Sequence, residues 1–183
     1  MAVDRTIRIL IISCGILSLV SVIMCLYSIS TANWYHSSIQ RIGLFHTCNI
    51  TISKTAKCEK NIYANSNQYS NDPVNGVYQL TYNKRFRGSG GLAIVAVIFQ
   101  IASIILSIYA SIIFLPNPSV TCWILPIIQF VVSLFMLATL SEASYGINMN
   151  GQSSSIYEAA LVSTMASTIV ASIAADRINK LST

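Results

Sequence analysis

The sequence predicts an all-α transmembrane protein, a four-helix bundle with a small extracellular β-sheet formed mainly by its first loop. Of the 183 residues, 54% are apolar and only 9% are charged, against about 25% charged in a typical soluble domain. The apolar residues fall into four blocks, each close to the roughly 20 residues that cross a hydrocarbon core. The stretch between the first two blocks is mostly polar, includes segments in which apolar and polar residues alternate, and contains two cysteines.

The first helix is predicted over residues 9–33, which contain no Asp, Glu, Lys, Arg or His. A cleaved signal peptide is the alternative interpretation, because Arg5 and Arg8 precede the apolar run and Ser30-Thr31-Ala32 resembles a cleavage site. The apolar core of a signal peptide is about 7 to 15 residues long, and this run is longer. We therefore expect a retained membrane helix.

The next two helices are predicted over residues 88–115 and 122–140, joined by an intracellular turn at 116–121. Pro116 and Pro118 separate them, because proline removes a backbone donor and disfavours helix at the residue before it. The fourth helix is predicted over 158–175, between a second extracellular loop at 141–157 and a cytosolic tail at 176–183. Backbone groups in lipid must be satisfied internally, so these continuous tracts predict helices rather than barrel strands. The whole chain, 1–183, is expected to form a single membrane domain.

Ionisable side chains are nearly missing from the four predicted helices. Apart from Glu158, the first residue of the fourth range, these segments contain no Asp, Glu, Lys, Arg or His. Proton relays, ion-coupled transport and voltage sensing depend on such residues, so these functions are disfavoured. Gln100 and Gln129 are expected at comparable depths and are predicted to hydrogen-bond to each other. Two amides do not make a water-filled path, which disfavours a pore within one chain.

Small residues recur every four positions along the fourth helix. Such a face lets another helix backbone approach closely, which is how membrane helices associate. We predict a face for packing within this chain, and keep a face for a partner helix as the alternative. Its members are Ala159, Ser163, Ser167, Ala171 and Ala175.

Two observations conflict on the orientation of the chain in the membrane: the basic charge of the first loop, and the cysteines and acceptor sequence in that loop. Seven of the eleven basic residues lie in the first loop, 34–87, and a simple count of positive charge would place that loop in the cytosol. The loop is near the length beyond which its charge stops deciding, and a first helix with a basic amino end often decides instead. Cys48 and Cys58, the only loop cysteines, and the acceptor sequence Asn49-Ile50-Thr51 both favour the secretory lumen. We expect a multi-pass plasma-membrane protein with both termini cytosolic.

The first loop also shows β-strand patterns. Residues 43–52 and 77–82 alternate and are rich in Thr, Tyr, Ile and Val, which predicts strands. Residues 61–75 are rich in Asn and Ser and are expected to be a connecting loop. A disulfide between Cys48 and Cys58 would staple neighbouring strands and close a ring of about ten residues, worth roughly 2 to 3 kcal/mol.

A short motif in this loop resembles a known superfamily. Trp34 follows the first helix, and Gly43-Leu44-Phe45, Cys48 and Cys58 come after it. This order resembles the Trp, Gly-Leu-Trp, Cys, Cys signature of the claudin, peripheral myelin protein and epithelial membrane protein superfamily. Phe45 replaces the usual second Trp, and the short spacing after Trp34 is closer to peripheral and epithelial membrane proteins. The topology is similar over nearly the whole chain, although the motif itself is six residues.

The resemblance implies a bundle beneath an extracellular sheet, with Trp34 and the Gly-Leu-aromatic residues anchoring the sheet at the outer leaflet. Members of the superfamily build paracellular barriers, mediate adhesion, or serve as accessory subunits of ion channels and receptors. The expected partners are membrane lipid and another membrane protein, through self-association at cell junctions or through a channel or receptor. The tail ending at Thr183 lacks the hydrophobic carboxyl terminus by which typical claudins bind scaffolds, which favours the accessory role.

No catalytic, cofactor or metal site is expected. His36, His46, Cys48 and Cys58 lack the spacing of a metal site, and cysteines outside the cell oxidise. Nucleic-acid binding needs a cationic face on a wettable domain, whereas basic residues are missing from long tracts of this chain. The first loop has a net charge of +5, from seven basic residues against Glu59 and Asp72, and would attract anions if it lined a paracellular gap.

Overall fold

The computed structural model describes residues 5–38, 40–50, 56–63, 70–74, 77–82, 84–112 and 122–182, with side chains at 5–38, 40–50, 57–61, 85–111 and 122–181. The predicted intracellular turn at 116–121 and Thr51 of the acceptor sequence lie outside these residues.

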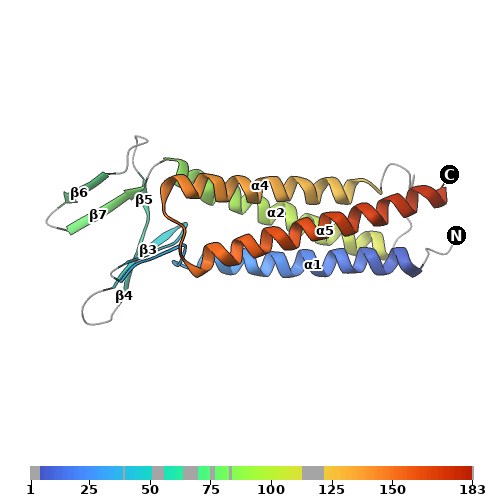
Figure 1. The fold of residues 1–183 in the computed structure, drawn as a ribbon, viewed down its shortest axis with the longest axis horizontal. Coiled ribbons are helices and arrows are strands. Elements are labelled where there is room, and N and C mark those ends of the chain that lie inside the picture. Colours follow the sequence, from blue (N-terminus) through green and yellow to red (C-terminus); the bar gives the residue numbers. More distant parts are fainter. Residues whose placement is uncertain are drawn as a thin grey trace. The chain divides into compact units, whose positions relative to one another are not determined.

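Four long helices dominate the described part of the chain (Figure 1). All four are long and apolar enough to cross a membrane, which indicates a multi-pass membrane protein. The fourth is longer than its apolar run, because helical hydrogen bonding continues into the polar residues on both sides. The helices are α1 (Arg5–Ser30), α2 (Lys84–Ile112), α4 (Ile124–Gly146) and α5 (Gln152–Ser182).

The chain divides into two compact units, and each contains a segment of all four helices. We call Met1–Met24, Val95–Phe135 and Ala159–Thr183 the terminal unit, because it contains both chain ends. Cys25–Ile94 and Met136–Glu158 form the sheet unit, which contains all the described β-strands.

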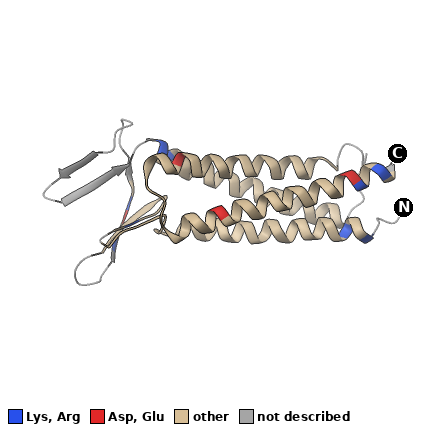
Figure 2. Cartoon of the chain, viewed as in Figure 1, with Lys and Arg blue, Asp and Glu red and all other residues tan. Residues whose placement is uncertain are grey.

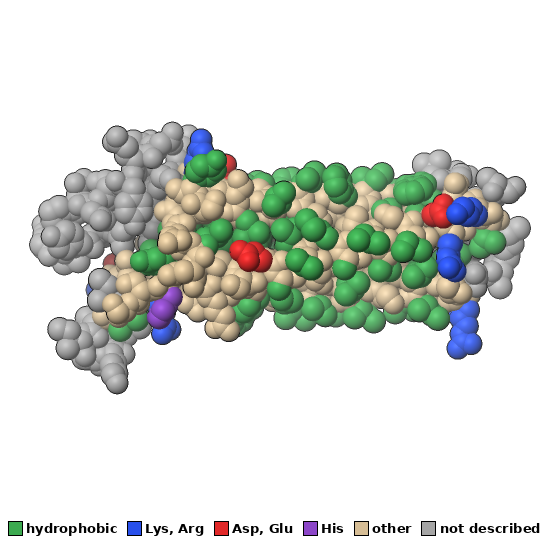
Figure 3. Space-filling view, viewed as in Figure 1, with side chains coloured by type: hydrophobic (Ala, Val, Ile, Leu, Met, Phe, Trp, Pro, Cys, Tyr) green, Lys and Arg blue, Asp and Glu red, His purple; other side chains and the backbone are tan. Residues whose placement is uncertain are grey.

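Buried positions in each helix alternate spacings of four and three residues. This average period of 3.5 is typical of left-handed helix bundles, in which one seam of every helix faces its neighbours. The remaining faces carry exposed Ile, Leu, Val and Phe, as expected of helices surrounded by lipid, and Figure 3 shows such side chains along the helices. In α1 the seam consists of Ile7, Ile11, Cys14, Ser18, Ser21, Cys25 and Ser28.

The interior of the terminal unit is hydrogen-bonded through two glutamine amides. The Gln100 Nε2 group donates to Ser21 Oγ at 2.6 Å and to Thr164 Oγ1 at 2.8 Å. The Gln129 Nε2 group donates to the hydroxyls of Ser18 and Ser103. The predicted bond between the two glutamines is therefore wrong. The Nε2 group of each glutamine donates instead to hydroxyls from two other helices. These hydroxyls are buried in the seams.

The first loop forms a four-stranded antiparallel sheet in the order β1-β2-β3-β4. Its strands are β1 (Tyr35–His36), β2 (Gln40–Ile42), β3 (His46–Ile50) and β4 (Ala56–Lys60). Along β3 the side chain of Cys48 is buried, while that of the next residue, Asn49, which points to the opposite face, is exposed. A strand with one covered face shows this alternation.

A second sheet contains β5 (Ile62–Tyr63), β6 (Ser70–Val74) and β7 (Val77–Tyr82) in the order β5-β7-β6. The prediction of a connecting loop over 61–75 is wrong, because β5 and β6 both fall within it. Pro73 lies in β6, which is an edge strand of this sheet, and proline is tolerated at an edge because no ladder bond has to be donated there. The predicted strand at 77–82 coincides with β7.

Candidate functional site

The site with the most specific geometry is the attachment of the four-stranded sheet to the helix ends of the sheet unit. Trp34 follows α1 and is fully buried. Its indole Nε1 donates to the Ser28 carbonyl at 2.9 Å, and its ring lies 5.3 Å from the buried ring of Tyr157 in α5, centroid to centroid. An indole that is both packed and hydrogen-bonded fixes the start of the sheet relative to α1 and α5.

The segment between α4 and α5 hydrogen-bonds to β1 and to the residue before it. The backbone N–H of Gly151 donates to the Trp34 carbonyl at 2.9 Å. The Asn150 amide accepts from the His36 N–H at 2.8 Å and donates to the His36 carbonyl at 3.1 Å, which pairs it with β1 as a neighbouring strand would. A Cβ atom at Gly151 would collide with the Asn33 carbonyl, so this close approach requires glycine.

A buried turn links β2 and β3 at the predicted Gly-Leu-aromatic motif. The Gly43 N–H donates to the His46 carbonyl at 2.8 Å, and a Cβ at Gly43 would lie 2.6 Å from the Thr31 carbonyl oxygen. Leu44 is fully buried. The ring of Phe45 packs on Gly90 of α2, where a Cβ would lie 2.9 Å from it. The motif residues therefore seat the turn on the helix ends.

Asn61 is a site residue that sequence reasoning missed. Its Nδ2 donates to the Gly43 carbonyl at 2.9 Å, its backbone N–H donates to the Phe45 carbonyl at 2.9 Å, and its Oδ1 accepts from the Thr47 hydroxyl at 2.7 Å. The residue is buried. It opens an Asn- and Ser-rich stretch with the composition of an ordinary loop, so no local signal distinguished it.

The predicted disulfide is present between Cys48 and Cys58. These residues are register partners in β3 and β4, so the covalent bond staples two strands that are already paired. The Asn49 side chain beside it is exposed, and its Oδ1 accepts from Gln40 Nε2 at 3.1 Å. Its glycosylation stays a prediction.

The exposed charges of this sheet are mostly basic. Lys57 pairs with Glu59 at 3.1 Å, and the Lys57 side chain is 81% exposed, so solvent screens the pair strongly. Arg41 and Lys60 are also exposed. Lys54 and the side chain of Lys84 lie outside the described residues. Figure 2 shows the charged positions of α1 and α4 at the helix ends.

The predicted small-residue face of α5 turns gradually from the surface into the interior. Ala159 is exposed and Ser163 is half-buried, whereas Ala171 is almost fully buried. A four-residue repeat drifts relative to the 3.5-residue burial period, which explains this change. Ser163 Oγ donates to the Leu17 carbonyl of α1 at 3.2 Å. The two remaining members, Ser167 and Ala175, are buried as well.

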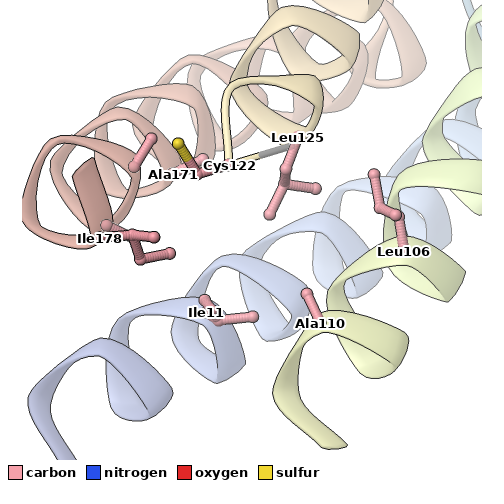
Figure 4. Close-up of a pocket in the computed structure, with 9 residues that line it drawn as sticks. Ile11, Leu106, Ala110, Cys122, Leu125, Ala171 and Ile178 are labelled. Carbon is pink, nitrogen blue, oxygen red and sulfur yellow. The ribbon is translucent and has the colours of Figure 1, made fainter. Parts of the chain in front are cut away.

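A small cavity of about 20 Å³ lies in the terminal unit (Figure 4). Its lining is apolar and comes from all four helices, with Ile11, Leu106, Leu125 and Ile178 among the side chains. A volume of this size has room for about one water molecule. Among the described residues, no three His, Cys, Asp or Glu side chains come close enough to hold a metal ion.

A scan against protein-family models finds no match, and a search of curated proteins finds no similar sequence. The architecture, with four long apolar helices and a small antiparallel four-stranded sheet, is compatible with the claudin-like layout.

Proposed function

We propose that the chain is a claudin-like membrane protein that acts in cell–cell contact, adhesion or a paracellular barrier through its extracellular loops. The observation that carries the proposal is the seating of the four-stranded sheet. Trp34 is held to α1 through its bond to the Ser28 carbonyl and accepts from the Gly151 N–H just before α5. Asn61 holds the Gly43 turn within the sheet, while β3 and β4 keep an exposed face. Since binding loses less free energy when the binding surface is already ordered, a stapled and anchored sheet is suited to present one fixed surface.

The charge of that surface determines what it can meet. Arg41, Lys57 and Lys60 are exposed against Glu59 alone among the described residues of the sheet. Such a surface attracts anions or an acidic protein surface over a screening length of about 8 Å at physiological salt. Contact at short range is therefore expected to weaken as the salt concentration rises.

The test uses the full-length protein in nanodiscs and measures its binding to the surface of its native cells. We expect more binding than with empty nanodiscs, and loss of most of it in the triple variant Arg41→Glu, Lys57→Glu, Lys60→Glu. The double variant Arg5→Glu, Arg8→Glu changes charge at the amino end of α1 and is the matched control. Binding no greater than that of empty nanodiscs would contradict the proposal.

An accessory subunit of an ion channel or receptor is the second candidate, and the glycines of α2 favour it. Gly88 and Gly91 lie on the exposed surface of this helix, and a Cβ at either would meet open space. Glycine within a helix costs about 1 kcal/mol relative to alanine, and neither glycine relieves a contact with a described residue. Bare backbone of this kind allows close approach of a partner helix.

Mild-detergent affinity purification from native cells tests this second candidate. Recovery of a larger channel or receptor in near-equal amount is expected, together with its loss in the double variant Gly88→Leu, Gly91→Leu. Ala102→Leu adds the same bulk at an exposed position of α2 and should leave recovery unchanged. Recovery of only the protein itself and junctional proteins would reject the accessory role.

A further inference from the structure

Glu158 lies on the outward surface of a membrane helix. It is the seventh residue of α5 (Gln152–Ser182), a helix long and apolar enough to cross a membrane. The residue is exposed. Carboxylates within membrane segments almost always face the bundle interior or a water-filled cavity, where partners compensate them. An outward-facing carboxylate is therefore unusual.

Contacts within the sheet unit give the depth of Glu158. Ser28 Oγ of α1 donates to the Ser153 carbonyl of α5 at 2.6 Å, which places these two residues at one level. Glu158 follows Ser153 by five residues, or about 7.5 Å along the helix. On α1, Leu26 is only about 3 Å below Ser28, and its side chain is 47% exposed. The carboxylate position is thus about 4.5 Å deeper than an exposed leucine.

Nothing within the described chain compensates this charge. The described ion pairs are Lys57 with Glu59 and Lys180 with Asp176, and Glu158 belongs to neither. Figure 3 shows acidic side-chain atoms on the visible helix surface, with hydrophobic side chains nearby. In an α-helix, side chains lean toward the amino end. The Glu158 carboxylate therefore leans toward the sheet end of α5, the direction from which a long basic side chain can reach it.

We propose that Glu158 is a lateral docking contact that binds a guanidinium or ammonium side chain carried by a transmembrane helix of a partner protein. Such a bond gives both charges a partner at a depth where each is costly alone. The inference is independent of the cell-contact function and does not use the exposed face of the sheet.

The test places the full-length protein, labelled with a donor fluorophore, in phosphatidylcholine vesicles with an acceptor-labelled polyleucine transmembrane peptide. One peptide carries a single Arg about one and a half turns inside its end, and the matched peptide carries Gln there. We expect energy transfer to report about tenfold tighter association with the Arg peptide, in line with the strength of polar contacts between membrane helices. Glu158→Gln should abolish this preference, and Glu158→Asp should retain it.

Asp176→Asn is the matched control, because it removes an exposed carboxylate near the other end of α5, and it should leave the preference intact. Equal association of both peptides with the unmodified protein would overturn the proposal. So would a preference for Arg that survives Glu158→Gln, because the peptide would then bind elsewhere. Energy transfer between two labelled copies of this chain that depends on Glu158 without any peptide would identify a second copy as the occupant and would also overturn it.

Discussion

At the scale of single residues, Trp34 anchors the sheet to α1 and α5. Trp34→Ala removes the buried ring that packs on Tyr157 and the indole bond to the Ser28 carbonyl. Truncating a buried Trp typically costs about 3 to 5 kcal/mol, so we expect a lower unfolding temperature of the detergent-purified protein and retention in the secretory pathway. Trp34→Phe keeps a ring and loses mainly the hydrogen bond, so its cost should be about 1 to 2 kcal/mol. Equal unfolding temperatures for all three proteins would contradict the anchoring role.

The state of the five cysteines gives a second prediction, which counting maleimide labels can check. Cys14, Cys25 and Cys122 are buried thiols outside any disulfide, whereas Cys48 and Cys58 are bonded to each other. Burial also raises the pKa of the Cys122 thiol, which lowers the fraction of reactive thiolate at neutral pH. Intact mass after maleimide treatment should show almost no label on the folded protein, three labels in denaturant and five after reduction. Five labels in denaturant without reductant would show that the disulfide is absent.

At the scale of elements, the place of a residue in the 3.5-residue burial period of its helix, rather than its size, decides whether it is buried. Ala159 and Ala160 are adjacent alanines, but Ala160 is fully buried and its carbonyl accepts from Ser21 and Thr164, while Ala159 is exposed. Ala160→Leu should overpack the interior and cost about 1 to 3 kcal/mol, whereas Ala159→Leu should change stability by less than about 0.5 kcal/mol. Thermal unfolding of both variants in the same detergent measures the difference. A smaller loss for Ala160→Leu than for Ala159→Leu would reverse the assigned helix orientation.

Much of the element order could be predicted. Long apolar runs predict membrane helices, and alternation of apolar and polar residues predicts strands. The details that failed depend on partners distant in sequence. Gln100 was expected to bond to Gln129, but hydroxyls of Ser21 and Thr164 compete for its amide. Asn61 lies in a stretch with the composition of a loop, yet it holds the Gly43 turn. No local pattern encodes contacts of this kind.

The whole molecule combines an apolar helical part with an anchored, stapled sheet whose described exposed charge is mainly basic. The proposed contact function needs this sheet to meet another surface across a cell boundary. The most direct measurement is fluorescence of the tagged full-length protein in mosaic cell layers, comparing borders between two expressing cells with borders between an expressing and a non-expressing cell.

The account predicts that the protein is more concentrated at both kinds of border than on free membrane, and that Arg41→Glu, Lys57→Glu, Lys60→Glu reduces this enrichment without reducing surface delivery. A uniform distribution over contacting and free membrane, in cells that deliver the protein normally to their surface, would contradict the contact function.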